Sequence, residues 1–81
     1  MIHVITEQSW STPKGNVMGQ PLAPRPRMID TKLGREAAEL CAIARSEKFD
    51  HHGYNAEGDY WFGREKDGYE VHRFVVRPAT P

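Results

Sequence analysis

Prolines and glycines crowd positions 11 to 27, and this feature limits the possible folds of the chain more than any other. The segment holds Pro13, Gly15, Gly19, Pro21, Pro24 and Pro26. Each proline removes a backbone amide donor and biases the preceding residue toward extended backbone, so neither a long helix nor a central strand fits here. We predict that residues 11–29 form a long loop or an arm, which either wraps across the core or serves a function of its own.

The rest of the 81-residue chain predicts one small α+β domain over residues 1–81. The single cysteine excludes an internal disulfide, so packing or a partner has to stabilise the fold. The expected elements are, in chain order, an N-terminal strand at 2–6, the long loop, one helix from 32 to about 50 capped by Asp30 or Thr31, and a C-terminal antiparallel hairpin within 58–76. The small sheet is expected to pack on the helix.

The predicted helix has one apolar stripe. Its members recur at steps of three and four residues and are Leu33, Ala37, Leu40, Cys41 and Ala44, with Ile43 at the margin. This stripe is expected to face the sheet. Gly53 is expected to end the helix in a left-handed conformation, with His51 and His52 at the negative end of the helix dipole.

The register of the predicted hairpin can be argued from charge. A two-residue turn at Asp67 and Gly68 would place Glu65 opposite Glu70, which is an unfavourable pair of like charges. A three-residue connection at 66–68 avoids that pair, and we predict this second register. It places Tyr60, Phe62, Phe74 and Val76 on one face and Trp61, Tyr69, Val71 and Val75 on the other.

Both faces of this hairpin are apolar, whereas one helix can cover only one face of a small sheet. The second face therefore needs another cover. The candidates are the chain's own N-terminal part, a second copy of the protein in a homodimer, or a binding partner. In the first case Trp10, Val17, Met18 and Leu22 would fold over the second face.

No catalytic, cofactor or metal site is predicted. His51 and His52 are adjacent, so on a helix they would point about 100° apart and could not share one metal ion. Cys41 lies within the helical stripe, where a thiol is usually a small buried apolar group. The serines lack the glycine-rich turn of a nucleophile elbow, and no pair of carboxylates is marked out for acid–base work. We therefore expect a protein that is not an enzyme and needs no cofactor.

Aromatic residues and arginines together are typical of protein interfaces, and such binding does not require a net positive charge. The predicted partner-binding residues are Tyr60, Trp61, Phe62, Arg64 and Arg73 of the hairpin, with Arg25 and Arg27 of the loop. The first hypothesis is a non-enzymatic protein-binding inhibitor module. The alternative is a small nucleic-acid-binding domain that stacks bases on the same rings, although the formal net charge of zero and the four acidic residues in or beside the hairpin weaken phosphate attraction.

The size of the chain, its order of strand, loop, helix and hairpin, and its aromatic hairpin without an enzyme motif resemble small phage-borne inhibitors of the anti-CRISPR kind. The resemblance implies binding to a CRISPR effector subunit in the host cytoplasm. That class shares no sequence signature, so it assigns no residue here; many of its members are acidic DNA mimics, and this neutral chain departs from that pattern. The sequence also lacks an apolar run long enough to cross a bilayer, and we expect a cytoplasmic protein with no membrane partner.

Overall fold

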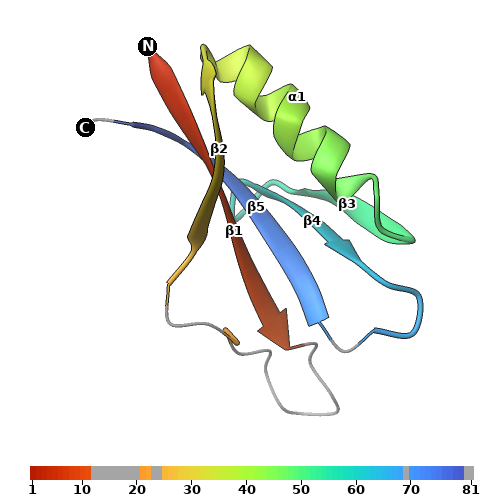
Figure 1. Cartoon of the computed structure of the whole chain (residues 1–81). Helices are drawn as coiled ribbons and strands as arrows, with labels where there is room; N and C mark the ends of the chain where they lie inside the picture. Colours follow the sequence, from red (N-terminus) through yellow and green to blue (C-terminus); the bar gives the residue numbers. More distant parts are fainter. Residues whose placement is uncertain (12–20, 23–24, 69, 80–81) are drawn as a thin grey trace.

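The computed structural model describes residues 1–11, 21–22, 25–68 and 70–79. Within them the chain forms five strands and one helix: β1 (Ile2–Ser11), β2 (Arg27–Leu33), α1 (Arg35–Ser46), β3 (His51–Asn55), β4 (Tyr60–Arg64) and β5 (Glu70–Pro78). The strands make one antiparallel sheet in the order β2-β1-β5-β4-β3, and α1 crosses one of its faces (Figure 1). The small α+β fold is thus confirmed, with two strands more than predicted.

The two terminal strands form the middle of the sheet. β1 runs antiparallel to β5 from the pair His3–Pro78 to the pair Ser11–Glu70, so the predicted strand at 2–6 is five residues longer at its C-terminal end. The first and last segments of the chain therefore meet in the longest ladder of the sheet, as Figure 1 shows. Of the described residues, none belongs to a helix long and apolar enough to cross a membrane.

The helix begins later and ends earlier than predicted, at Arg35 and Ser46. Residues 27–33 instead form β2, which pairs with β1. Asp30 is therefore not a helix cap, and its carboxylate accepts a hydrogen bond from the Thr31 amide (2.8 Å). Gly34 links strand to helix with φ 95°, a left-handed value that glycine adopts without strain.

The predicted apolar stripe of the helix is wrong by one position. Ala38 and Ala42 are fully buried, whereas Leu33 and Leu40 are 78% and 61% exposed. The large buried side chains come from the sheet, namely Ile5, Phe74 and Val76. Alanines allow the helix to lie close to these bulky residues, so the helix buries its smallest side chains.

Residues 51–55 form β3 rather than the end of a helix. Gly53 lies in this strand opposite Phe62, and His51 and His52 pair with Arg64 and Gly63 of β4. The predicted left-handed stop at Gly53 and the predicted histidine caps are therefore wrong. Pairing with β4 imposes the extended backbone on a segment whose composition does not favour a strand.

The hairpin register also differs from the prediction by one residue. The observed pairs are Trp61–Phe74, Phe62–Arg73 and Gly63–His72. Glu65 lies beyond the end of β4, in a turn that the Gly68 amide closes on the Glu65 carbonyl (3.1 Å), so its repulsion with Glu70 costs little. Because neighbouring residues on a strand point to opposite faces, this shift places Trp61, and not Phe62, on the face that α1 covers.

Candidate functional site

The face of the sheet turned away from α1 is the candidate site, and we refer to it as the open face. Alternation along the paired strands assigns to it Ile2, Val4, Thr6, Gln8 and Trp10 of β1, Tyr60, Phe62 and Arg64 of β4, Val71, Arg73, Val75 and Arg77 of β5, and His51, Gly53 and Asn55 of β3. None of the described residues of this face, including Met28, Thr31 and Leu33 of β2, is acidic. The face of the sheet opposite α1 is thus aromatic and basic.

Arg73 lies at the centre of the open face between two aromatic rings. Its guanidinium carbon is 4.0 Å from the centroid of the Trp10 ring and 4.7 Å from that of Tyr60. Cation–π contacts of this kind hold the guanidinium plane in a fixed position. The Nε atom of Arg73 is buried and has no hydrogen-bond partner within the described part of the chain.

Two glycines allow the rings of the open face to lie close to the sheet. A Cβ atom at Gly53 would lie 2.9 Å from Cζ of Phe62, and one at Gly58 would lie 2.7 Å from Cδ2 of Tyr60. Real Cβ atoms do not approach that closely, so any larger residue at either position would displace the ring. Gly58 thereby helps to keep Tyr60 beside Arg73.

Asp59 neutralises the arginine at the far end of β5. Its Oδ2 atom lies 3.6 Å from Arg77 Nη1 and 3.7 Å from Arg35 Nη2, and its Oδ1 atom accepts a 2.7 Å hydrogen bond from the Tyr54 hydroxyl. That hydrogen bond raises the pKa of Tyr54 above its usual value. In the described chain, Arg64 and Arg73 are then the arginines of the open face that lack a carboxylate partner.

The structure brings four of the seven predicted binding residues together. Tyr60, Phe62, Arg64 and Arg73 share the open face, whereas Trp61 faces α1, packs against the core and contacts the Tyr54 ring at 4.8 Å. Arg25 is exposed between strands, and Arg27 pairs with Glu7 across the edge of the sheet (3.1 Å). Trp10 was missed as a binding residue because the first strand was predicted to end at residue 6; the alternation of Val4, Thr6, Gln8 and Trp10 was its signal.

Among the described residues, the loop pairs through its backbone with the end of β1. Pro21 forms a bridge with Trp10, and the Leu22 amide donates to the Ser9 carbonyl (2.8 Å). The Leu22 side chain is exposed. Val17 and Met18, the other predicted anchors, lie outside the described residues.

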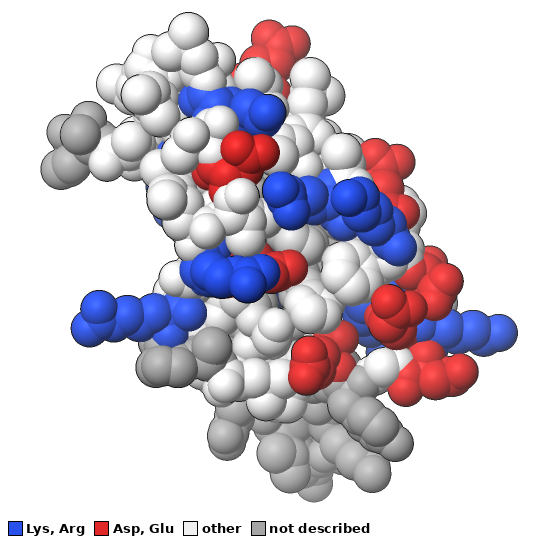
Figure 2. Space-filling model, viewed as in Figure 1, with Lys and Arg blue, Asp and Glu red and all other residues white. Residues whose placement is uncertain are grey.

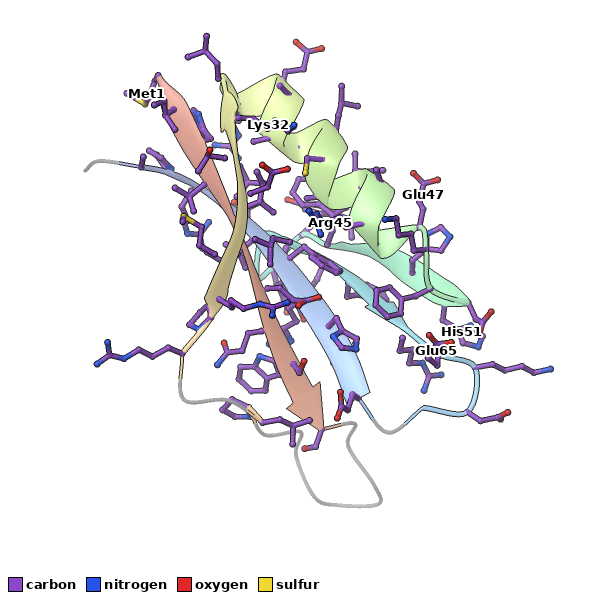
Figure 3. All side chains as sticks on the ribbon, viewed as in Figure 1. Met1, Lys32, Arg45, Glu47, His51 and Glu65 are labelled. Atoms are coloured by element: carbon purple, nitrogen blue, oxygen red, sulfur yellow. The ribbon has the colours of Figure 1, made fainter. Side chains whose placement is uncertain are left out.

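The helix-covered side contains two clusters of polar groups. Lys32 and Arg45, both labelled in Figure 3, lie 3.7 and 3.9 Å from Oδ2 of Asp30. The hydrogen bond from the Thr31 amide, together with Lys32, Cys41 and Arg45, holds the pKa of the Asp30 carboxyl below its usual value. The second cluster joins β1 to β5, with His72 Nδ1 3.2 Å from Ser9 Oγ and 3.7 Å from Glu7 Oε2. Within the described part of the chain, no group of histidine, cysteine or acidic residues is arranged to hold a metal ion.

Acidic and basic side chains lie next to each other over the surface seen in Figure 2. This mixture contrasts with the open face, whose described strand positions include arginine but no lysine, aspartate or glutamate. No family model, curated protein or solved structure matches the chain, so a function has to be inferred from the geometry of this face.

Proposed function

We propose that the chain is a non-enzymatic binding module that docks a partner protein on the open face of its sheet. One observation supports this most directly: Trp10, Tyr60 and Arg73 form a stacked group on a sheet face that α1 does not cover. Tryptophan, tyrosine and arginine are the residues that most often dominate the binding energy of protein interfaces. The absence of acidic side chains from the described strands of this face matches a partner with an acidic patch.

A nucleic acid is the second candidate, and the placement of the acidic residues weakens one argument against it. Glu65 and Asp67 follow β4 outside the ladder, Glu70 lies on the helix-covered face, and Asp59 pairs with Arg77 at one end of the open face. However, Arg64 and Arg73 alone would supply few phosphate contacts, and the affinity of proteins for nucleic acids rests mainly on such contacts. A protein partner needs fewer charges, and for this reason we place it first.

The proposal is tested by comparing two single variants of the immobilised chain in lysate of the organism that encodes it. Phe62→Ala removes a ring from the open face, whereas Leu40→Ala shortens an exposed side chain on the outer surface of α1. We expect Phe62→Ala to lose a specifically captured protein that the unaltered chain and Leu40→Ala both retain. Equal capture by all three chains would exclude the open face as the docking surface.

A salt titration with a single-stranded oligonucleotide separates the two candidates. We expect the chain not to bind the oligonucleotide with an affinity that falls steeply as the salt concentration rises. An affinity that does fall steeply with salt, and that is lost in Phe62→Ala, would favour the nucleic-acid function. Light scattering at low concentration tests whether a second copy of the chain occupies the face. The resemblance to anti-CRISPR inhibitors predicts that the partner is a CRISPR effector subunit, and the sequence predicts a cytoplasmic location. Both stay predictions.

A further inference from the structure

The open face contains a hollow of about 250 Å³ at its centre. Its lining residues are Thr6, Gln8, Trp10, Pro26, Gly58, Tyr60, Arg73 and Val75. The hollow is open to solvent and has room for a small ionic group together with water molecules. Among the described residues of its lining, the guanidinium of Arg73 is the one charged side chain, and none is acidic.

Arg73 lines this hollow with a buried side-chain donor that has no partner within the described part of the chain. A guanidinium presents five N–H donors in a rigid planar fork and stays protonated. The buried donor of Arg73 is its Nε atom, which has no hydrogen-bond partner among the described residues. Leaving a buried donor unpaired is unfavourable, so an acceptor at this position would satisfy it.

The two rings prepare the guanidinium for a ligand. Trp10 and Tyr60 fix its plane, so little side-chain freedom remains to be lost on binding. The planar fork of arginine matches the paired oxygens of a carboxylate or phosphate, with which it forms two parallel hydrogen bonds. Thr6 adds a hydroxyl to the same lining.

We infer that Arg73, held between Trp10 and Tyr60, binds a carboxylate or phosphate group in this hollow. The inference rests on the proposed function in that the group belongs to the docking partner, as an acidic or a phosphorylated side chain. Arg73 then determines which partner fits, and Phe62 and its apolar neighbours supply contact area around it.

The test uses the full chain labelled with ¹⁵N and two probes, inorganic phosphate and acetate, with sodium chloride at matched ionic strength as the blank. The reporters are the Arg73 Nε–H signal and the indole N–H signal of Trp10; the indole of Trp61, on the opposite face, is the internal control. We expect at least one probe to shift the first two signals saturably and to leave Trp61 unchanged. Saturation by phosphate alone assigns a phosphorylated side chain, and saturation by acetate assigns an acidic one.

Three variants show whether the binding belongs to Arg73. Arg73→Lys keeps the charge but loses the fork, and we expect it to weaken probe binding by roughly tenfold or more, monitored at the Trp10 indole. Arg73→Gln should abolish it, whereas Lys48→Gln, which removes an exposed positive charge outside the lining of the hollow, should change it by less than about twofold. Thermal melts of each variant check that the fold is retained.

Shifts that do not saturate, or that persist unchanged in Arg73→Gln, would overturn the anion site. The result is separable from that of the capture experiment. If Phe62→Ala loses the partner while neither probe binds, docking on the open face stands and the anion site falls. If the probes bind through Arg73 while no partner depends on Phe62, the anion site stands and the protein-docking proposal falls.

Discussion

Replacing Gly63 by alanine tests which face of the sheet is packed. Gly63 is buried in β4, and a Cβ atom there would clash with Cδ2 of Phe49 and lie 2.8 Å from its Cγ and 2.9 Å from its Cβ. Carbon atoms in good contact lie about 3.5–4.0 Å apart, so Phe49 has to move by roughly 1 Å. The contact involves the root of the side chain, which rotation about χ1 cannot remove. The Phe49 ring is also held by His72 and Phe74, at centroid distances of 4.8 and 6.2 Å.

The expected cost of Gly63→Ala follows from two opposing effects. Overpacking of a core costs about 1–3 kcal/mol, and replacing glycine by alanine regains about 0.4–1 kcal/mol from the unfolded chain. The net loss in the free energy of unfolding is then about 1–2 kcal/mol, or a fall in Tm of roughly 5–15 °C for a domain of this size.

Gly53→Ala is the matched control, because its Cβ also meets a ring but on the open face. That contact is with the tip of Phe62, at Cζ (2.9 Å) and Cε1 (3.2 Å), and the tip can swing toward solvent. We expect a change within about 0.5 kcal/mol in either direction. Urea unfolding followed by circular dichroism measures both variants. Equal destabilisation would show that Phe62 is packed as tightly as Phe49, and the description of an open face would then be wrong.

Three further outcomes are expected. Trp61→Ala should lower the free energy of unfolding, measured by thermal or urea unfolding, by about 2 kcal/mol. This is less than the roughly 3–5 kcal/mol expected for a fully buried ring, because Trp61 is partly exposed. Capture of the partner should fall more in Phe62→Ala than in Trp61→Ala. The pKa of Asp30 is lowered in the folded protein, so its carboxylate stabilises the fold above pH 3.8, and this stabilisation is lost as the pH falls through the pKa of the folded state. The Tm difference between the unaltered chain and Asp30→Asn should therefore shrink between about pH 5 and about pH 2. The pKa of Tyr54 is raised in the folded protein, so its hydrogen bond to Asp59 stabilises the fold below pH 10.0, and this stabilisation is lost as the pH rises through the pKa of the folded state. The Tm of Tyr54→Phe, which cannot donate this bond, should therefore fall less at alkaline pH than the Tm of the unaltered chain.

The sequence predicted the kinds of element better than their extent. One helix, a first strand and a C-terminal hairpin all exist, but β2 and β3 were missed. In β2, Asp30 and Thr31 were predicted to cap a helix because aspartate and threonine are preferred at the N-cap. In the structure, pairing with β1 places both residues in a strand. In β3, histidine, glycine and asparagine have little preference for strands, and the ladder with β4 decides the conformation.

The hairpin register shows why the charge argument gave the wrong prediction. A surface pair of like charges costs less than about 1 kcal/mol, whereas burying a phenylalanine or valine contributes about 1.5–3 kcal/mol each. The observed register places Trp61 beside Phe74 and Val76 on the helix-covered face, where Phe74 and Val76 are buried. Glu65 leaves the ladder and so avoids most of the repulsion.

The same register determines what the open face can bind. A strand alternates between the two faces, so burying Phe74 and Val76 under α1 forces Arg73 and Val75 to the opposite side, and the pairing with β4 brings Tyr60 and Phe62 with them. Glu7, Asp30 and Glu70 fall on the helix-covered side by the same rule. The core and the binding surface are therefore not independent: a shift of one residue would exchange Phe62 for Trp61 on the open face. A neutral chain acquires a basic, aromatic surface because packing of the core sorts its charges between two faces.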